Sequence, residues 1–198
     1  MTSSFRRTLR RTLRRTVCAA FAFLVVGCTH TVGFHPLPGA PPELTAGKTA
    51  AAVRLFMPVE LQNATRSIRA QLNNWIVGYG ARTHHFATTY LEAAFTDFQE
   101  VSSAAAPPTP GFLVNIQQVE YNVEDQAAHI TMVVEVSDGS GANLLTKQYR
   151  ADGWSGIGAA MGGGVFAEKG IIRSSTDQAL KEMFLTLIRD LRRQLAPA

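Results

Sequence analysis

Cysteine is scarce in this 198-residue sequence, which contains two, Cys18 and Cys28. Cys18 lies inside an apolar run near the N-terminus, so removal of that run would leave Cys28 as the one remaining cysteine. A single cysteine excludes an intramolecular disulfide, and the domain must then rely on its hydrophobic core. The length suits one domain with additional terminal segments.

Long apolar runs are also scarce. The run Val17–Val26 has ten residues and would rise about 15 Å as a helix, about half the thickness of a bilayer core. It therefore fits a transmembrane anchor poorly. Residues 1–27 also carry six arginines and no acidic residue, and a basic segment followed by a short apolar run is typical of a secretory signal peptide. We predict such a signal over residues 1–27, with twin-arginine export as the alternative route.

Charge is low, at 17% of the residues, and the formal net charge of +4 is unevenly spread. Six of the 19 basic residues lie in the predicted signal, so 13 basic and 15 acidic side chains remain after its removal. The basic character of the full chain then belongs to a segment that is expected to be cleaved. We therefore expect no nucleic-acid partner.

Motifs for catalysis and metal binding are missing. The sequence contains no H-E-x-x-H, C-x-x-C or G-x-S-x-G pattern. The neighbouring His84 and His85 would point about 100° apart on a helix, which disfavours a shared metal ion. Ser155, His129 and Asp152 could form a Ser-His-Asp set, but their spacing does not distinguish them from a chance combination. We expect a protein that is not an enzyme, with no catalytic residue, no metal and no cofactor.

The apolar run ends in the motif Val25-Val26-Gly27-Cys28. This motif resembles the lipobox of bacterial lipoproteins, which has an aliphatic residue three before the cysteine and a small residue just before it. The resemblance implies cleavage between Gly27 and Cys28, a diacylglycerol thioether on Cys28, and a fatty acid such as palmitate on the new amino terminus. Several acyl chains would anchor the protein stably. An ordinary signal peptide with a chance cysteine is the alternative.

The residue after the cysteine is Thr29. The resemblance to Gram-negative lipoproteins implies sorting to the outer membrane, because Asp at this place is the usual signal for retention in the inner membrane.

Proline and glycine divide the rest of the chain. Residues 29–50 contain four prolines and three glycines, which disfavour a helix or a central strand. We predict a lipidated cysteine with a Pro-rich tether over residues 28–50, followed by a single domain over residues 51–198. A second Pro-rich stretch, residues 102–111, is predicted to be a surface loop.

Hydrophobic periodicity predicts the elements of that domain. Strands are expected at residues 51–57, 112–123, 129–137 and 144–154, with a bulge near Gln117–Gln118 where the alternation changes phase. Amphipathic helices are expected at residues 84–101 and 174–195. Ser174 or Ser175 would cap the second helix, with Asp177 in its first turn. Residues 61–77 are ambiguous, since their apolar side chains recur at roughly helical spacing.

This order of elements predicts an α+β fold. We expect a two-layer sandwich in which an antiparallel sheet of about four strands carries two amphipathic helices on one face. Behind a lipobox, the order resembles several small envelope lipoproteins, namely the lipopolysaccharide-assembly lipoprotein, the auxiliary lipoproteins of lipid-trafficking ABC transport systems and the YajG-like lipoproteins. The resemblance covers Ala51–Leu195, and the helix core Tyr90–Phe95 ahead of the Phe112 strand is its nearest local cue. It concerns the fold and not a function.

A glycine-rich segment is the remaining feature. Gly153–Gly170 contains seven of the sixteen glycines and no charged residue before Glu168. It is either a connector or a segment that contacts a partner or a lipid, with Trp154, Met161 and Phe166 as the candidate contacts.

The sequence therefore predicts a lipid-anchored outer-membrane lipoprotein that faces the periplasm. We expect a non-enzymatic accessory or binding component in cell-envelope assembly or transport, with the membrane and an envelope protein or lipid as partners. A lipid-binding or lipid-transfer module of an envelope trafficking system is the alternative, and an exported hydrolase is a third. Co-purification of an outer-membrane protein would favour the first, and bound lipid would favour the second.

Overall fold

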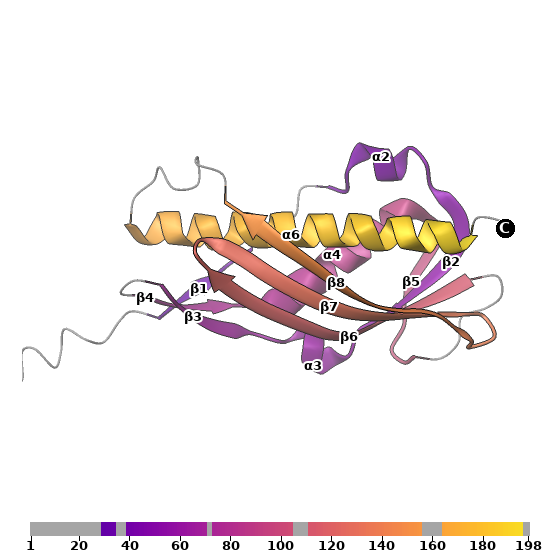
Figure 1. The fold of residues 1–198 in the computed structure, drawn as a ribbon, viewed down its shortest axis with the longest axis horizontal. Coiled ribbons are helices and arrows are strands. Elements are labelled where there is room, and N and C mark those ends of the chain that lie inside the picture. Colours follow the sequence, from indigo (N-terminus) through magenta and orange to yellow (C-terminus); the bar gives the residue numbers. More distant parts are fainter. Residues whose placement is uncertain (1–28, 35–38, 71–72, 105–110, 156–163, 196–198) are drawn as a thin grey trace, which may run out of the picture.

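The computed structural model describes residues 29–34, 39–70, 73–104, 111–155 and 164–195. Its largest unit is a five-stranded sheet with the strand order β5-β2-β6-β7-β8. The strands are β2 Thr49–Phe56, β5 Phe95–Glu100, β6 Gly111–Glu124, β7 Ala127–Asp138 and β8 Asn143–Trp154. The three long strands β6, β7 and β8 run side by side along the molecule (Figure 1).

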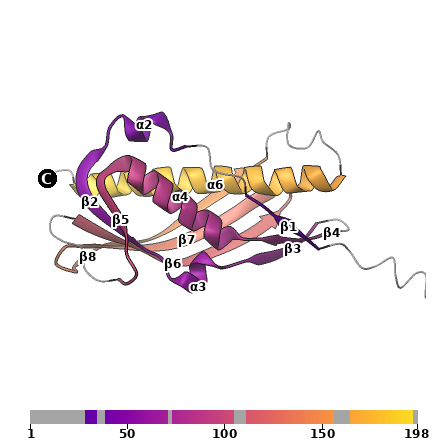
Figure 2. The ribbon, with the colours of Figure 1, turned by 180° about the vertical axis from the view of Figure 1, so that it is seen from behind.

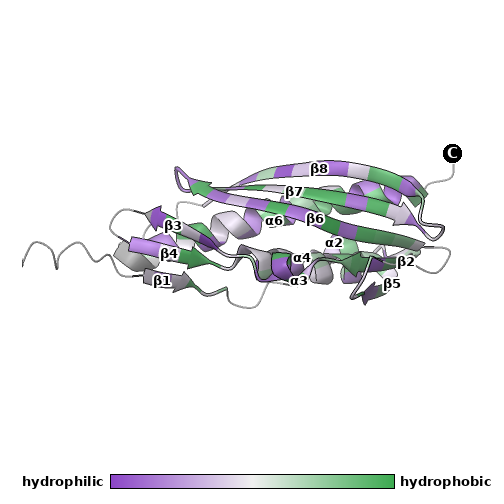
Figure 3. Cartoon of the chain, turned by 90° about the horizontal axis from the view of Figure 1, so that it is seen from below, coloured by the Kyte–Doolittle hydropathy of each residue, from purple (hydrophilic) through white to green (hydrophobic). Residues whose placement is uncertain are grey.

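The three antiparallel strands expected between residues 112 and 154 are confirmed. β6 pairs with β7, and β7 pairs with β8, in antiparallel fashion. The β6–β7 register shifts between Ile116 and Gln118, where the sequence predicts a bulge. On β7, alternate residues from Ala128 onward enter the core, namely Ala128, Ile130, Met132, Val134 and Val136, and Ala127 at the start of the strand is also buried. Hydrophilic and hydrophobic residues alternate along these strands (Figure 3), as expected for a sheet with one covered face.

The sheet as a whole is mixed, so the prediction of an antiparallel sheet of about four strands is wrong in strand count and direction. β2 pairs in parallel with β5 on one side and with β6 on the other. The missed strand is β5, because the helix expected over residues 84–101 ends earlier. Helix α4 spans Tyr79–Ala94, and the chain then continues as β5. Phe and Thr favour strands, and the edge of β2 offers backbone hydrogen bonds to this segment.

Two helices cover one face of the large sheet, as the sequence predicts. Helix α6, Gly164–Leu195, lies along β7 and β8, while α4 lies along β5 and β2 and also contacts α6 (Figures 1 and 2). The ring of Phe184 on α6 lies 6.5 Å from that of Phe86 and 6.4 Å from that of Tyr90. The expected apolar face of α6 is buried, with Leu180, Met183, Phe184, Leu187, Ile188 and Leu191 each at most 2% exposed.

Helix α6 begins at Gly164 rather than at Ser174, so the predicted cap is wrong. Ser175 is fully buried inside the helix, and its hydroxyl donates a hydrogen bond to the carbonyl oxygen of Ile171 at 2.8 Å. A serine hydroxyl that bonds back to the preceding turn can lie within a helix, and this makes Ser a misleading cap signal here. Asp177 consequently lies well inside α6.

A second, three-stranded sheet lies at one end of the molecule, with the order β1-β4-β3. Its strands are β1 Thr29–Val32, β3 Arg66–Ala70 and β4 Asn73–Val77, and the short helix α3 Val59–Gln62 precedes β3. β1 runs parallel to β4, and β3 runs antiparallel to it. The ambiguous segment 61–77 is thus mainly strand, with Trp75 and Val77 in the core.

The described part of the expected tether is folded against the domain. Val32 of β1 is 2% exposed, and the short helix α2, Pro42–Thr45, buries Leu44. Pro42 is compatible with α2, because it lies in the first turn of the helix. Backbone N–H groups in the first turn have no acceptor within the helix, so the missing N–H of proline removes no hydrogen bond. Thr29 already belongs to a sheet. The predicted signal peptide, its cleavage site and Cys28 lie outside the described residues, and the division at residue 51 stays a prediction.

β8 and α6 approach each other closely at Gly153. A Cβ atom on this residue would lie 1.8 Å from the carbonyl oxygen of Ser175 and 2.7 Å from the backbone nitrogen of Ala179. Both contacts are with backbone, which cannot swing aside as a side chain can. The separation of the sheet and the helix therefore requires glycine at position 153.

Gly153→Ala should destabilise the domain, because β8 or α6 must move to admit the methyl group. Overpacking of this kind costs about 1–3 kcal/mol, and urea unfolding followed by circular dichroism would measure it. Gly47→Ala is the control, since no atom lies within 4 Å of the added Cβ. Equal stability of the two variants would contradict the close packing.

The helices are joined by a buried ion pair between Arg82 of α4 and Asp177 of α6. Arg82 Nε and Nη2 donate to the two carboxylate oxygens at 2.8 and 2.7 Å. The Arg82 side chain is 4% exposed and that of Asp177 is 27% exposed. Burial raises the pKa of Asp177, and the guanidinium of Arg82 opposes that rise. The guanidinium also lies over the rings of Phe34 and Phe86, at 4.7 and 5.4 Å from their centroids.

Asp177→Ala should lower the free energy of unfolding by about 2–3 kcal/mol, near the low end for a broken buried pair because Asp177 is partly hydrated. Glu100→Ala is the control. It removes a more exposed carboxylate that bonds His84 at 2.8 Å, and surface pairs contribute little. If both variants melted alike, the pair would not hold the helices together.

Candidate functional site

Two strand edges face each other without pairing. β2 pairs with β6 at Gly111–Asn115, so the rest of this edge of β6 has no strand partner among the described residues. β3 pairs with β4 on one side, and its other edge approaches β6. No backbone hydrogen bond joins β3 to β6 in the described part of the chain. We call the space between these edges the inter-edge groove.

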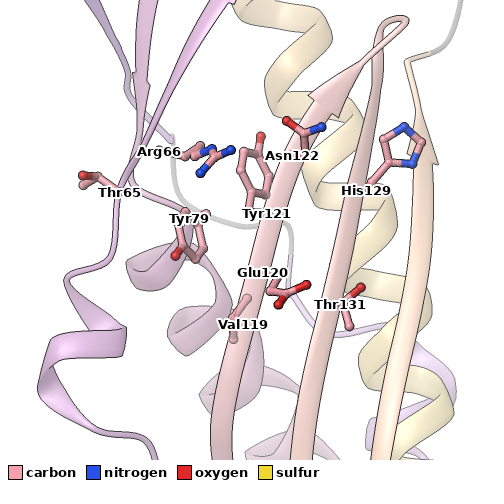
Figure 4. Close-up of a pocket in the computed structure, with 9 residues that line it drawn as sticks. All are labelled: Thr65, Arg66, Tyr79, Val119, Glu120, Tyr121, Asn122, His129 and Thr131. Atoms are coloured by element: carbon pink, nitrogen blue, oxygen red, sulfur yellow. The ribbon is translucent and has the colours of Figure 1, made fainter.

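Two hollows lie along the inter-edge groove. The first has a volume of about 510 Å³, and it is lined by Thr65, Arg66, Tyr79, Val119, Glu120, Tyr121, Asn122, His129 and Thr131 (Figure 4). The second has a volume of about 410 Å³, and it is lined by Ile68, Arg69, Val123, Glu124, Asp125, Gln126, Glu168, Ile171 and Ile172. Successive residues of β6 line the first hollow, so it extends over the edge of the strand from the helix side to the open face.

The floor of the first hollow is aromatic. The rings of Tyr79 and Tyr121 stack at 5.3 Å with an angle of 5° between their planes, and both lie between β3 and β6 in Figure 4. The Tyr121 hydroxyl bonds the Thr176 hydroxyl of α6 at 2.8 Å. Burial raises the pKa of Tyr121, so its hydroxyl is neutral at physiological pH. The stack and the hydrogen bond together hold the Tyr121 ring in a fixed position at the floor of the first hollow.

The two rims carry opposite charges. Arg66 and Arg69 project from β3, whereas Glu120 and Glu124 belong to β6 and Asp125 to the following turn. All five are exposed. No ion pair closes the inter-edge groove across these rims within the described residues, so both charged rims are open to a ligand.

The turn between β6 and β7 has unusual backbone angles. Asp125 and Gln126 have φ values of 49° and 65°, the left-handed region that favours glycine. A two-residue hairpin turn with positive φ at both positions matches the twist of its strands. This turn forms the end of the second hollow.

Of the candidate Ser-His-Asp set, the structure brings two members together. His129 Nδ1 lies 2.7 Å from Asp152 Oδ1, because the two residues pair across β7 and β8. Ser155 follows β8 and makes no hydrogen bond to His129 in the described structure. The described structure therefore does not assemble the three residues as a Ser-His-Asp triad.

The structure describes only part of the predicted contact set Trp154, Met161 and Phe166. Trp154 lies at the end of β8 and is 61% exposed, and its backbone N–H donates to Gln178 Oε1 at 3.0 Å. Met161 lies outside the described residues, and so does the side chain of Phe166. Gly27 and Cys28 lie outside them as well. Among the residues that the structure describes, Trp154 lines neither hollow of the inter-edge groove, and the prediction for Met161 and Phe166 stays untested.

The inter-edge groove is not predicted from the sequence. One sequence pattern indicates a part of the groove. Polar residues alternate around Ile68 in the segment Arg66–Ala70, which is typical of a strand. Sequence alone could not show that this strand would stop short of pairing with β6, because pairing is a long-range property.

Within the described ranges, no group of three His, Cys, Asp or Glu side chains could hold a metal ion. Among the same residues, no helix has both the length and the apolar character needed to cross a membrane.

No protein-family model and no curated protein matches the sequence. Similar solved structures include an uncharacterized protein, with a TM-score of 0.46 and 10% identity over 83% of this chain and 98% of that chain. A minor lipoprotein from Acinetobacter baumannii has a TM-score of 0.37 and 8% identity over 74% and 95%. The hypothetical protein CT253 from Chlamydia trachomatis has a TM-score of 0.36 and 13% identity over 74% and 96%. Since these TM-scores are below 0.5, we base the function on the residues of this chain.

Tyr121→Phe should lower the free energy of unfolding by about 1 kcal/mol, the net value of one hydrogen bond. The loss stays small because the Thr176 hydroxyl keeps its hydrogen bond to the Ile172 carbonyl oxygen at 2.6 Å. Tyr121→Ala removes the stacked ring and should lower the free energy of unfolding by about 3–5 kcal/mol. Chemical unfolding of both variants would check this order. A large loss in the Phe variant would mean that the hydroxyl, and not the ring, maintains the floor.

Proposed function

We propose that this protein is an outer-membrane lipoprotein, anchored through Cys28 and facing the periplasm, whose domain is a non-enzymatic binding component of the cell envelope. The ligand is an extended polypeptide segment of an envelope partner, which lies in the inter-edge groove. The observation that carries the proposal is the pair of unpaired strand edges, β3 and β6, facing each other across a hollow with an aromatic floor.

Strand edges bind extended peptides through backbone hydrogen bonds, and neighbouring pockets select the side chains. Exposed edges are usually blocked, because they invite pairing with other chains. The outer edge of β6 beyond Asn115 is not blocked by a described strand, and the aromatic stack beside it offers a contact for an apolar side chain. The acidic and basic rims would favour a segment that carries both charges.

The anchor supports this role through effective concentration. A domain held on the same membrane as its partner can act with weak intrinsic affinity, because the second contact becomes an intramolecular one. The lipobox motif that ends in Cys28 supports the anchor, and Thr29 supports the outer-membrane destination.

Cys28→Ala should abolish membrane association, since the thioether would be lost. Fractionation of cell envelopes, together with mass spectrometry of the mature chain, tests this prediction. The mature protein that retains Cys28 should be heavier than its polypeptide by a diacylglyceryl group and an acyl chain, whereas the Cys28→Ala variant should not. An unmodified Cys28 on a membrane-bound protein would refute the proposed anchor.

The groove is tested by photo-crosslinking in intact cells. A photoreactive amino acid replaces Asn122 in the inter-edge groove or, as the control, the exposed Glu182 on α6. We expect a discrete polypeptide adduct from position 122, weakened by Arg66→Glu with Arg69→Glu and unchanged by Arg189→Glu. Equal adducts from positions 122 and 182 would contradict a peptide site. A lipid adduct from position 122 would instead favour the lipid-transfer alternative.

A further inference from the structure

The proposed anchor is attached directly to a folded strand. Thr29 is adjacent to Cys28 and pairs with Asn74 at the start of β1. The rest of β1 continues in register along β4 as far as the pair Val32 and Val77. One residue spans at most about 3.6 Å, so a lipid on Cys28 would have no spacer between itself and the domain.

The start of β1 is tied to the start of α6. Asn73, at the beginning of β4, donates to Glu168 Oε2 at 3.2 Å. The indole nitrogen of Trp75 donates to the same oxygen at 3.0 Å. These bonds hold the first turns of α6 beside the strand that pairs with β1.

The turn between β6 and β7 lies at the same end of the molecule. Glu168 lines the second hollow together with Arg69, from the end of β3, and with Asp125 and Gln126 of that turn. Ala127 follows the turn and pairs with Trp154 at the end of β8. Figure 1 shows β1, β3, β4, the start of α6 and the β6–β7 turn gathered at its left side.

Trp154 is an exposed aromatic residue at this end of the described structure. Its side chain is 61% exposed, whereas Trp75 is 1% exposed. Trp is enriched at membrane interfaces, because its ring is apolar while its N–H is polar. Leu144 lies near the other end of β8 and is 37% exposed; ten residues of strand separate the two positions by about 33 Å.

We propose that this end of the domain sits on the phospholipid bilayer, with Trp154 turned toward the lipid headgroups. The inference rests on the proposed anchor at Cys28. Because the anchor joins a strand without a spacer, the rigid domain cannot turn this end away from the membrane. The second hollow of the inter-edge groove also lies at this end, so the groove would receive a partner segment close to the membrane surface.

Energy transfer from the domain to the bilayer tests the orientation. Mature protein carrying Trp154→Cys or Leu144→Cys is purified from membranes and labelled with a donor dye. Each preparation is inserted into preformed vesicles of phosphatidylethanolamine and phosphatidylglycerol that contain a headgroup-labelled acceptor lipid. We expect several-fold more efficient transfer from position 154 than from position 144. The two variants are matched, because both lie on β8 and replace exposed side chains.

A flexible linker supplies the second control. Insertion of about 20 Gly and Ser residues between Cys28 and Thr29 would release the domain, because such a chain is a random coil. The difference between positions 154 and 144 should then shrink. Equal transfer from both positions without the linker would overturn the orientation.

The labelling itself separates this inference from the proposed anchor. A lipid-modified Cys28 cannot react with the dye, so each variant should take up one dye per chain. Two dyes per chain would show a free Cys28 and overturn the anchor together with the orientation. One dye with equal transfer would leave the anchor intact and overturn the orientation alone.

Discussion

The buried ion pair between Arg82 and Asp177 is the interaction that fixes the relative positions of the parts. It holds α4 against α6 across the interior, and both helices then cover the same face of the large sheet. The guanidinium also lies over the ring of Phe34, two residues beyond β1. One side chain thus connects the two helices and the segment next to the proposed anchor. A buried pair of this kind contributes little net stability compared with apolar packing.

The inter-edge groove follows from a second close contact, between α4 and α3. A Cβ atom on Gly80 would lie 2.0 Å from the carbonyl oxygen of Leu61, and the Gly80 N–H donates to the carbonyl oxygen of Ala64 at 3.0 Å. These contacts fix the point at which the chain leaves α3 and enters β3. β3 then pairs with β4 and not with β6, so the edge of β6 is left open. The close packing of α4 on α3 thus places β3 beside β4 and opposite the open edge of β6.

The sequence predicted those elements whose pattern is local. The alternation on β7, the bulge near Gln117 and the apolar face of α6 depend on the spacing of a few neighbouring residues, and the structure confirms them. The errors have long-range causes. Residues 95–100 become a strand because β2 offers an edge. Residues 29–32 become a strand because β4 does, even though prolines and glycines nearby suggest a tether. The site was missed for the same reason, since two edges that do not pair leave no trace in either segment.

The His129–Asp152 pair lies on the open face of the sheet, beside the first hollow of the inter-edge groove. The two side chains are 33% and 45% exposed, so water screens their interaction and little is gained by aligning them for proton transfer. They arise from direct pairing of two strands, and Thr131 and Arg150 form the next pair on the same face. What the open face offers beside the inter-edge groove is a row of hydrogen-bonding side chains at the spacing of a strand. The proposed ligand, another extended chain, would match the spacing of that row.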